Sequence, residues 1–441
     1  MKSLMYRYYI LTIIVIMVGC SSFHHPINPL YTYIPFFQVS ANSQWVVYVR
    51  DVGLYSSPIT TSAQVAIAPK FYNDILASTH NIVITSDSTR IVYIDVYSNL
   101  YSSPITASAP VLINTGVNNF MVTPDSSAVV YTDSSSSLFS SPITTSIPEL
   151  IATKVNSFAI SSDNRNVVYT NVSSNLFSSP ITTSAPIQIA TSVNRFIITP
   201  DSSAVVYTDS SSDLYSSPIT TSAPVLINTK VNSFTVTPNS RALVFTNSSS
   251  TLYSSPITAS APVQIDTGVN SFTVSPDSIQ VLYTKDWISC TSYPNCYSFT
   301  LYSSPLTVSA PVAIDTGVTD FVVSPDSKTV VYSKTLADLY SSSITASTSM
   351  LIANGVNVFA INHDSSKVVF MSMSNNLYSI PITGGTLALI DTATNGFLLT
   401  TDSKMVVYTK TKRSLSYIIH GLYSSPITAS VPVIIDSGNT Y

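Results

Sequence analysis

Few side chains in this 441-residue sequence are of the types that carry out catalysis. It has five histidines, three cysteines and two tryptophans, and the histidines are scattered along the chain. We find no Gly-x-Ser-x-Gly nucleophile motif, no His-Glu-x-x-His zinc motif, no P-loop and no Gly-x-Gly-x-x-Gly motif. We therefore predict a protein that is not an enzyme and that uses no cofactor and no metal.

Side chains that suit a binding surface gather in three stretches of the sequence. Most are aromatic or basic, and interfaces favour Trp, Tyr and Arg as energetic hot spots. The candidate binding residues are Phe71, Tyr72, Trp287, Tyr293, Tyr297, Phe299, Lys412, Arg413, Tyr417 and His420. The alternative is that they pack locally and brace the structure.

Two of the cysteines, Cys290 and Cys296, lie close together within the second of these stretches. In an oxidising compartment they are expected to form a disulfide that closes a small loop. A zinc site is the alternative, but two thiols without nearby histidines make a poor one.

The amino-terminal segment has the features of a signal peptide. Lys2 and Arg7 precede an apolar run over residues 10–19 that is too short to span a bilayer. Residues 17–20, Met-Val-Gly-Cys, resemble a bacterial lipobox, where the first position is usually Leu. The resemblance implies cleavage before Cys20 and lipid attachment there, and Ser21 implies sorting to the outer membrane. The alternative is an ordinary secretory signal with a chance cysteine.

The rest of the chain is built from a repeat. A segment reading Leu-Tyr-Ser-Ser-Pro-Ile-Thr recurs ten times with small variations, usually in steps of 38 residues. The copies begin at Leu54, Leu100, Leu138, Leu176, Leu214, Leu252, Leu301, Leu339, Leu377 and Leu422. A Pro-Asp-Ser anchor keeps the same period at Asn42, Asp87, Asp125, Asp163, Asp201, Asn239, Asp277, Asp326, Asp364 and Asp402. Such a period predicts stacked units that bury their apolar faces against one another.

One repeat, residues 194–229, shows what each unit is expected to form. Strands are predicted over residues 196–199, 204–208, 214–219 and 225–227, with turn chemistry at 200–203. Four short antiparallel strands in about 40 residues are typical of one β-propeller blade. The fold class is therefore all-β, a propeller of about ten four-stranded blades. A single ring is favoured because an uninterrupted 38-residue step joins units five and six, and two five-bladed rings are the alternative.

The Pro-Asp-Ser anchor resembles the turn of the TolB-type, WD40-like propeller repeat. Ser275-Pro276-Asp277-Ser278 is one of the nearest copies, with Ser where the family has Gly. The resemblance covers residues 36–437 and implies the propeller fold. We accordingly expect a signal peptide over residues 1–19, a tether over 20–35 and the propeller over 36–437.

The three candidate binding stretches are insertions into the repeat. The spacing of the anchors assigns residues 69–80 to the connection between blades one and two, and residues 287–299 to a loop between strands two and three of blade six. Residues 410–420 take the equivalent place in blade ten. Because loops alternate between the two faces of an antiparallel blade, all three insertions are predicted to open on one face.

Composition limits the class of partner. Charged residues are 9% of the chain, and the formal net charge is −4. This mild acidity argues against nucleic acid as the partner, because nucleic acid needs a basic face.

The first hypothesis is a lipid-anchored envelope propeller, periplasmic or surface-exposed, that binds another envelope protein without catalysis and contacts the membrane only through its anchor. The alternatives are a carbohydrate-binding propeller and a structural or antigenic repeat array.

Overall fold

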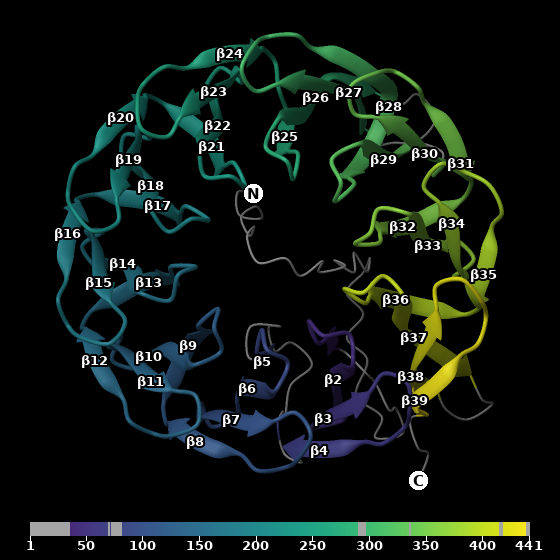
Figure 1. Ribbon diagram of the computed structural model, residues 1–441, viewed down its shortest axis with the longest axis horizontal. Coiled ribbons are helices and arrows are strands. Elements are labelled where there is room, and N and C mark those ends of the chain that lie inside the picture. Colours follow the sequence, from purple (N-terminus) through teal and green to yellow (C-terminus); the bar gives the residue numbers. More distant parts are fainter. Residues whose placement is uncertain are drawn as a thin grey trace.

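The computed structural model describes residues 36–68, 71, 82–289, 297–334, 337–413 and 418–437. These residues form no helix and 39 strands, which assemble into eight four-stranded sheets and one seven-stranded sheet, all antiparallel. The sheets stand side by side as the blades of one ring (Figure 1). This confirms the predicted ten-bladed propeller, and the single ring replaces the alternative of two five-bladed rings.

Blades one to five each consist of four consecutive strands. They are β1 (Phe36–Val39), β2 (Trp45–Arg50), β3 (Gly53–Pro58) and β4 (Val65–Ala68); β5 (Ile82–Ile84), β6 (Arg90–Ile94), β7 (Leu100–Pro104) and β8 (Val111–Asn114); β9 (Val117–Val122), β10 (Ala128–Asp133), β11 (Leu138–Pro142) and β12 (Glu149–Ala152); β13 (Val155–Ile160), β14 (Asn166–Asn171), β15 (Leu176–Pro180) and β16 (Ile187–Ala190); and β17 (Val193–Ile198), β18 (Ala204–Asp209), β19 (Leu214–Pro218) and β20 (Val225–Asn228).

Blades six to ten follow the same order, except that β28 serves two blades. They contain β21 (Val231–Val236), β22 (Ala242–Asn247), β23 (Leu252–Pro256) and β24 (Val263–Asp266); β25 (Ser271–Val274), β26 (Gln280–Ser289), β27 (Tyr297–Pro305) and β28 (Val312–Val323); β29 (Thr329–Lys334), β30 (Leu339–Ser343) and β31 (Met350–Ala353); β32 (Val356–Ile361), β33 (Lys367–Ser372), β34 (Leu377–Pro381) and β35 (Ala388–Asp391); and β36 (Thr394–Leu399), β37 (Met405–Arg413), β38 (Ile418–Pro426) and β39 (Val433–Asp436). Strand β28 pairs with β27 through its first half and with β29 through its second, so it ends blade seven and begins blade eight.

The hydrophobic core lies between neighbouring blades. Between blades four and five, for example, Leu176 and Ile189 pack against Val205, Tyr207 and Ile219, all nearly inaccessible to solvent. Tyr207 also stacks on its cross-strand neighbour, with ring centroids 5.4 Å apart. The aromatic ladder of the repeat is thus interblade packing.

The interface between blades ten and one uses the same positions as every other interface. There Leu422 and Ile435 of blade ten pack against Val46, Tyr48 and Ile59 of blade one. These are the repeat equivalents of the residues that join blades four and five. The ring is therefore closed by packing of side chains, and no described strand of blade ten joins the sheet of blade one.

A serine hydrogen bond joins each blade to the next at the Pro-Asp-Ser turn. The backbone N–H of Asp163 donates to Oγ of Ser202 in the following blade at 3.0 Å, and Asp402 donates in the same way to Ser43 across the closure. All ten interfaces have this bond, at 2.9–3.1 Å, with Asn164 in place of serine once.

This bond gives serine a role at this position that glycine could not fill. The accepting residues have φ between 59° and 64°, a left-handed conformation that costs an L-residue about 1–2 kcal/mol. A glycine would adopt it freely but would leave the N–H of the preceding blade without its side-chain partner. The turns therefore keep the left-handed geometry, and the hydroxyl offsets its strain.

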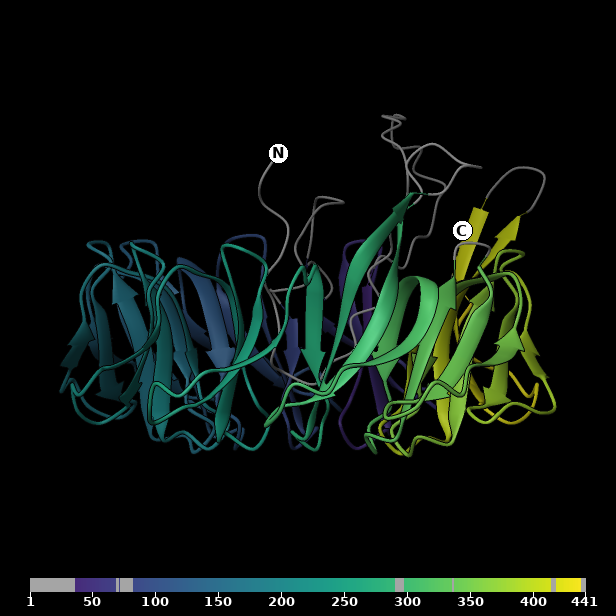
Figure 2. The same ribbon diagram turned by 90° about the horizontal axis from the view of Figure 1, so that it is seen from above.

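The two longest hairpins, β26–β27 and β37–β38, extend beyond the same face of the disc (Figure 2). Strand β26 has 10 residues and β27, β37 and β38 have 9 each, compared with 6 and 5 in the equivalent strands of blade five. We call this side the hairpin face. The assignment of residues 287–299 to blade six was wrong, because β26 and β27 belong to the seventh blade in chain order.

Substitution of Ser202 tests the serine bond. Ser202→Ala removes the acceptor and keeps the strained backbone, so it should lower the free energy of unfolding by about 0.5–1.5 kcal/mol. Ser202→Gly also loses the acceptor but relieves the strain, and it should be less destabilising than the alanine. Urea unfolding of the two variants checks this order. An alanine variant as stable as the parent would show that the bond contributes nothing.

Candidate functional site

Among the candidate binding residues whose side chains the structure describes, Trp287 is the most exposed. It lies in β26, and its side chain is 62% exposed. The pairing of β26 with β27 shifts register between Lys285 and Ile288, and Asp286 has a φ of 57°. Such a bulge inserts an extra residue and redirects a side chain. Here it presents the indole at the base of the blade-seven hairpin.

Two other candidates are packed more closely. The Phe71 side chain is 5% exposed and meets the ring of Tyr93 edge-on, with centroids 5.7 Å apart. It belongs to the core between blades one and two, so the prediction that it forms part of an exposed binding surface was wrong for this residue. The side chain of Phe299, in β27, is partly buried.

His420 sits at the base of the blade-ten hairpin. Its Nδ1 lies 3.2 Å from Oγ1 of Thr411 on the paired strand β37. Burial lowers the pKa of the imidazole, so the neutral form is favoured at neutral pH. His420 therefore joins the two strands of the hairpin.

Several predicted sites lie outside the described residues. These are Cys20, Tyr72, Cys290, Tyr293, Cys296 and Tyr417, together with the side chains of Tyr297, Lys412 and Arg413. The lipidation site, the disulfide and these parts of the binding surface stay predictions.

An ion pair with two aromatic partners anchors the base of the blade-seven hairpin to blade six. Asp266, the last residue of β24, accepts a hydrogen bond from the hydroxyl of Tyr283 at 2.7 Å and lies 2.9 Å from Nζ of Lys285. The ammonium of Lys285 also lies 4.7 Å from the ring centre of Tyr302 in β27, at cation–π distance. We call this arrangement the interblade ion pair.

The ion pair occurs at four of the ten interfaces, which flank the two hairpin blades, and the tyrosine hydrogen bond accompanies it at three of them. The acid and the cation are Asp266 and Lys285 (blades six and seven), Asp315 and Lys334 (seven and eight), Asp391 and Lys410 (nine and ten), and Asp436 and Arg50 (ten and one). In each case the cation also lies over a third-strand tyrosine, 4.6–5.6 Å from the ring centre. Each hairpin blade is thus held on both sides by partly buried charges.

The electrostatics favour the ionised form of Asp266 and Asp315. Burial alone would raise the pKa of Asp266, but hydrogen bonds from Lys285 and Tyr283 outweigh it and hold that pKa below its usual range. The pKa of Asp315 is lowered for the same reasons by Lys334 and Tyr332. Burial and the neighbouring carboxylate raise the pKa of Tyr283, so its hydroxyl stays a hydrogen-bond donor.

The sequence analysis missed these pairs, although the chain carries a signal for them. Three of them join an aspartate to a lysine 19 residues later, in a chain that is only 9% charged. The equivalent positions at the other six interfaces hold Ala68 and Asp95, Asn114 and Asp133, Ala152 and Asn171, Ala190 and Asp209, Asn228 and Asn247, and Ala353 and Ser372. An acid at the first position and a cation at the second therefore occur together, at four interfaces, or not at all.

The repeated aspartates and asparagines satisfy groups of their own blades. Oδ1 of Asp201 accepts hydrogen bonds from Oγ1 of Thr199 at 2.7 Å and from the N–H of Ser203 at 3.0 Å. On the hairpin face, Nδ2 of Asn118 donates to the backbone oxygen of Asp133 at 3.0 Å. No group of three or more His, Cys, Asp or Glu side chains able to hold a metal occurs among the described residues.

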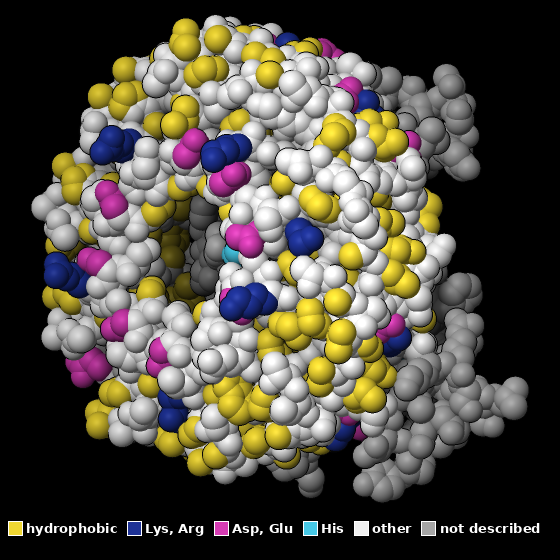
Figure 3. All heavy atoms as spheres, turned by 45° about the vertical axis from the view of Figure 1, so that its right-hand side comes forward, with side chains coloured by type: hydrophobic (Ala, Val, Ile, Leu, Met, Phe, Trp, Pro, Cys, Tyr) yellow, Lys and Arg dark blue, Asp and Glu magenta, His cyan; other side chains and the backbone are white. Residues whose placement is uncertain are grey.

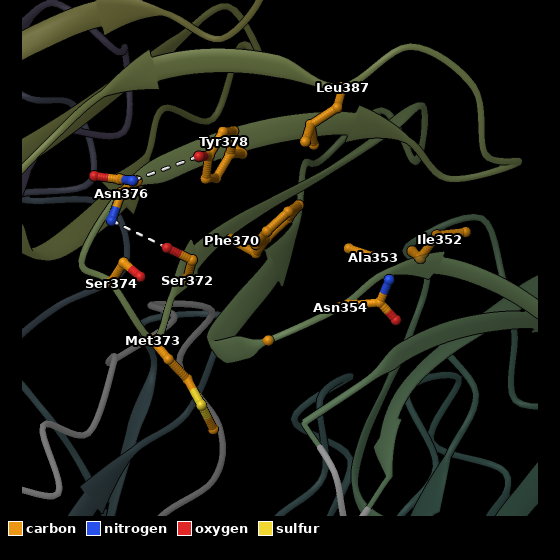
Figure 4. Close-up of a pocket in the computed structure, with 11 residues that line it drawn as sticks. Ile352, Ala353, Asn354, Phe370, Ser372, Met373, Ser374, Asn376, Tyr378 and Leu387 are labelled. Atoms are coloured by element: carbon orange, nitrogen blue, oxygen red, sulfur yellow. Dashed lines mark hydrogen bonds between the residues drawn. The ribbon is translucent and has the colours of Figure 1, made fainter.

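A cavity of about 500 Å³ lies between blades eight and nine (Figure 4). Its lining combines the blade-to-blade connection at Asn354 and Gly355 with the loop from Met373 to Asn376 between β33 and β34. Connections of both kinds lie on the hairpin face. The cavity is thus midway between the blade-seven and blade-ten hairpins along the ring.

The outer surface of blades eight to ten shows few charged side chains, with apolar ones scattered among them (Figure 3). The fourth strands contribute Leu351, Leu389 and Ile434, each 43–47% exposed. Over the part of the chain that the structure covers, there is no helix long and apolar enough to cross a membrane.

Comparison with known proteins reveals a shared fold and no family. No protein-family model matches the chain, and no curated protein matches its sequence. A crystal structure of the eukaryotic initiation factor matches 91% of this chain and 96% of its own, with a TM-score of 0.54 and 10% identity. This likeness concerns the overall fold alone.

Two further solved structures match more distantly. The tricorn protease gives a TM-score of 0.38 at 10% identity, over 89% of this chain and 48% of its own. An oligogalacturonate lyase in complex with manganese gives 0.36 at 12% identity, over 67% and 93%. Scores of this size carry no argument about function.

Replacement of Lys285 tests the interblade ion pair. Lys285→Met keeps the apolar stem but leaves the partly buried Asp266 without its cation, so it should lower the free energy of unfolding by roughly 1–3 kcal/mol. The matched control is Lys328→Met, because Lys328 is 81% exposed and lies 4.0 Å from Asp326. The control should change stability by less than about 0.5 kcal/mol. Equal losses in both variants would contradict a stabilising role for the pair.

Proposed function

We propose that this chain is a lipid-anchored envelope protein whose propeller binds another protein through its hairpin face, without catalysis. The observation that carries the proposal is the placement of the interblade ion pairs. All four flank the two blades whose hairpins extend from the disc. A projecting hairpin that binds a partner gains from a rigid base, because less freedom is lost on binding.

The chemistry of the base supports a protein partner. Trp287 is exposed beside a fixed bulge, and aromatic side chains of this kind commonly anchor protein interfaces. The rest of the repetitive surface is rich in serine and threonine and poor in charge, so the irregular hairpins are the most distinctive surface of the molecule. The TolB-type turn resemblance agrees with the proposed envelope location.

The partner can be sought by crosslinking in solubilised bacterial envelope. The bait is the chain from Cys20 onward, beside a trimmed variant in which Ser-Ser-Ser-Asp, the sequence of residues 210–213, replaces residues 286–300 and 411–421. Both cations of the ion pairs at these hairpins, Lys285 and Lys410, are retained. A stoichiometric partner captured by the parent and lost on trimming is expected.

Two single substitutions refine this test. Trp287→Ala should weaken capture at least tenfold if the indole anchors the partner. Ile147→Ala is the matched control, because Ile147 is similarly exposed, at 66%, in a turn on the opposite face. Capture that survives trimming and Trp287→Ala would place the partner elsewhere and overturn the proposal.

The anchor is tested separately. The parent chain expressed with its amino terminus should enter the detergent phase, with a mass on the Cys20 peptide that matches a lipidated cysteine. Cys20→Ala should move the protein to the aqueous phase, because two or more acyl chains are needed for a stable anchor. Identical partitioning of both proteins, without added mass, would show that the segment is not a lipoprotein signal.

A further inference from the structure

The interface between blades eight and nine lacks all three groups that form the ion pair at its neighbours. Between blades seven and eight, Asp315, Tyr332 and Lys334 meet. The equivalent residues one repeat later are Ala353, Phe370 and Ser372. Alanine removes the carboxylate, phenylalanine removes the hydroxyl and serine removes the long cationic side chain. The cavity of about 500 Å³ lies where these groups would be, and all three residues line it.

The missing lysine leaves one aromatic ring without its cation. In blade eight the ammonium of Lys334 lies 4.6 Å from the ring centre of Tyr340. The equivalent ring in blade nine is Tyr378, which is partly exposed and lines the cavity. Phe370 stacks against this ring, with ring centroids 5.5 Å apart. Tyr378 is therefore an aromatic platform held in place by the blade.

Polar groups surround this platform, and none of the eleven lining residues is charged. The amide of Asn376 donates to the hydroxyl of Tyr378 at 3.5 Å, and the Asn376 N–H donates to Oγ of Ser372 at 3.2 Å (Figure 4). Asn354 faces them across the cavity. Met373 and Leu387, 67% and 47% exposed, add apolar surface. Amides and hydroxyls can both donate and accept hydrogen bonds.

We propose that this cavity binds a neutral saccharide. A pyranose ring has an apolar C–H face that suits the Tyr378 ring, and hydroxyls that suit the amides of Asn354 and Asn376. The volume lies within the range of about 300–1,000 Å³ typical of small-molecule sites. A charged ligand would lose hydration without meeting an opposite charge, since the carboxylate and the ammonium are both absent. The saccharide site is separate from the protein-binding hairpins and does not depend on them.

The cavity can be filled with a set of three side chains that already occurs at a neighbouring interface. Ala353→Asp, Phe370→Tyr and Ser372→Lys together recreate the arrangement between blades seven and eight. The matched control introduces the same pair between blades three and four, where Tyr169 is already present, by Ala152→Asp and Asn171→Lys. Both variants should keep the thermal unfolding midpoint of the parent or raise it.

Binding is measured by calorimetry and saturation-transfer NMR on the chain from residue 20 onward. The probes are glucose, galactose, mannose, N-acetylglucosamine, maltose and chitobiose, with glucosamine and glucuronate as charged comparators. We expect at least one neutral sugar to bind with a dissociation constant on the order of 1 mM. The filled variant should bind it at least tenfold more weakly, and the control should bind it as the parent does.

A third variant keeps the proposal testable if the filled protein misfolds. Tyr378→Leu removes the aromatic platform while keeping apolar volume, and it too should weaken binding of that sugar at least tenfold. No binding of any neutral sugar by the parent, or unchanged binding in the filled and Tyr378→Leu variants, would overturn the proposal. Tighter binding of a charged comparator than of every neutral sugar would also overturn it.

Discussion

The hydrogen bond from an anchor-turn N–H to a side chain of the next blade, nearly always a serine, is the constraint that every interface of the ring shares. The turn that donates from Asp163 also presents Asn164, which accepts from the blade before it. Every turn therefore has one donor and one acceptor that point to opposite neighbours. The same geometry repeats at all ten interfaces, including the closure from Asp402 to Ser43. The apolar core brings the blades together, and these bonds hold them in one register.

The architecture could be predicted because its signals are local and repeated. For blade five, the predicted strands agree with β17 to β20 apart from a few terminal residues. The wrong blade number for residues 287–299 was an error of counting and left the predicted face of the hairpin unchanged. Phe71 was misjudged because the sequence does not show which aromatic side chain of an insertion turns inward onto Tyr93.

The interblade features were harder to predict, for a physical reason. Asp266 and Lys285 meet only because the outermost strand of one blade lies beside the second strand of the next. Arg50 and Asp436 are brought together only by ring closure. A search for functional motifs could not find the cavity, because it lies where smaller or less polar residues replace the aspartate, tyrosine and lysine of the neighbouring interfaces. In the sequence the cavity shows only as departures from the ion-pair pattern at Ala353, Phe370 and Ser372. These departures can be recognised only once that pattern is known.

Each blade is a continuous chain segment, and no described strand crosses from the last repeat to the first. An in-frame duplication or deletion of one 38-residue unit among blades two to five would therefore add or remove a whole sheet without splitting one, whereas blades seven and eight share β28 and one sheet. Among blades two to five the new junction, like the old, would hold no pair of an acid and a cation. A break between Asp266 and Lys285 would instead part an acid from its base. Gene rearrangement among blades two to five would thus preserve the contacts between blades, whereas rearrangement around the hairpins would break an ion pair.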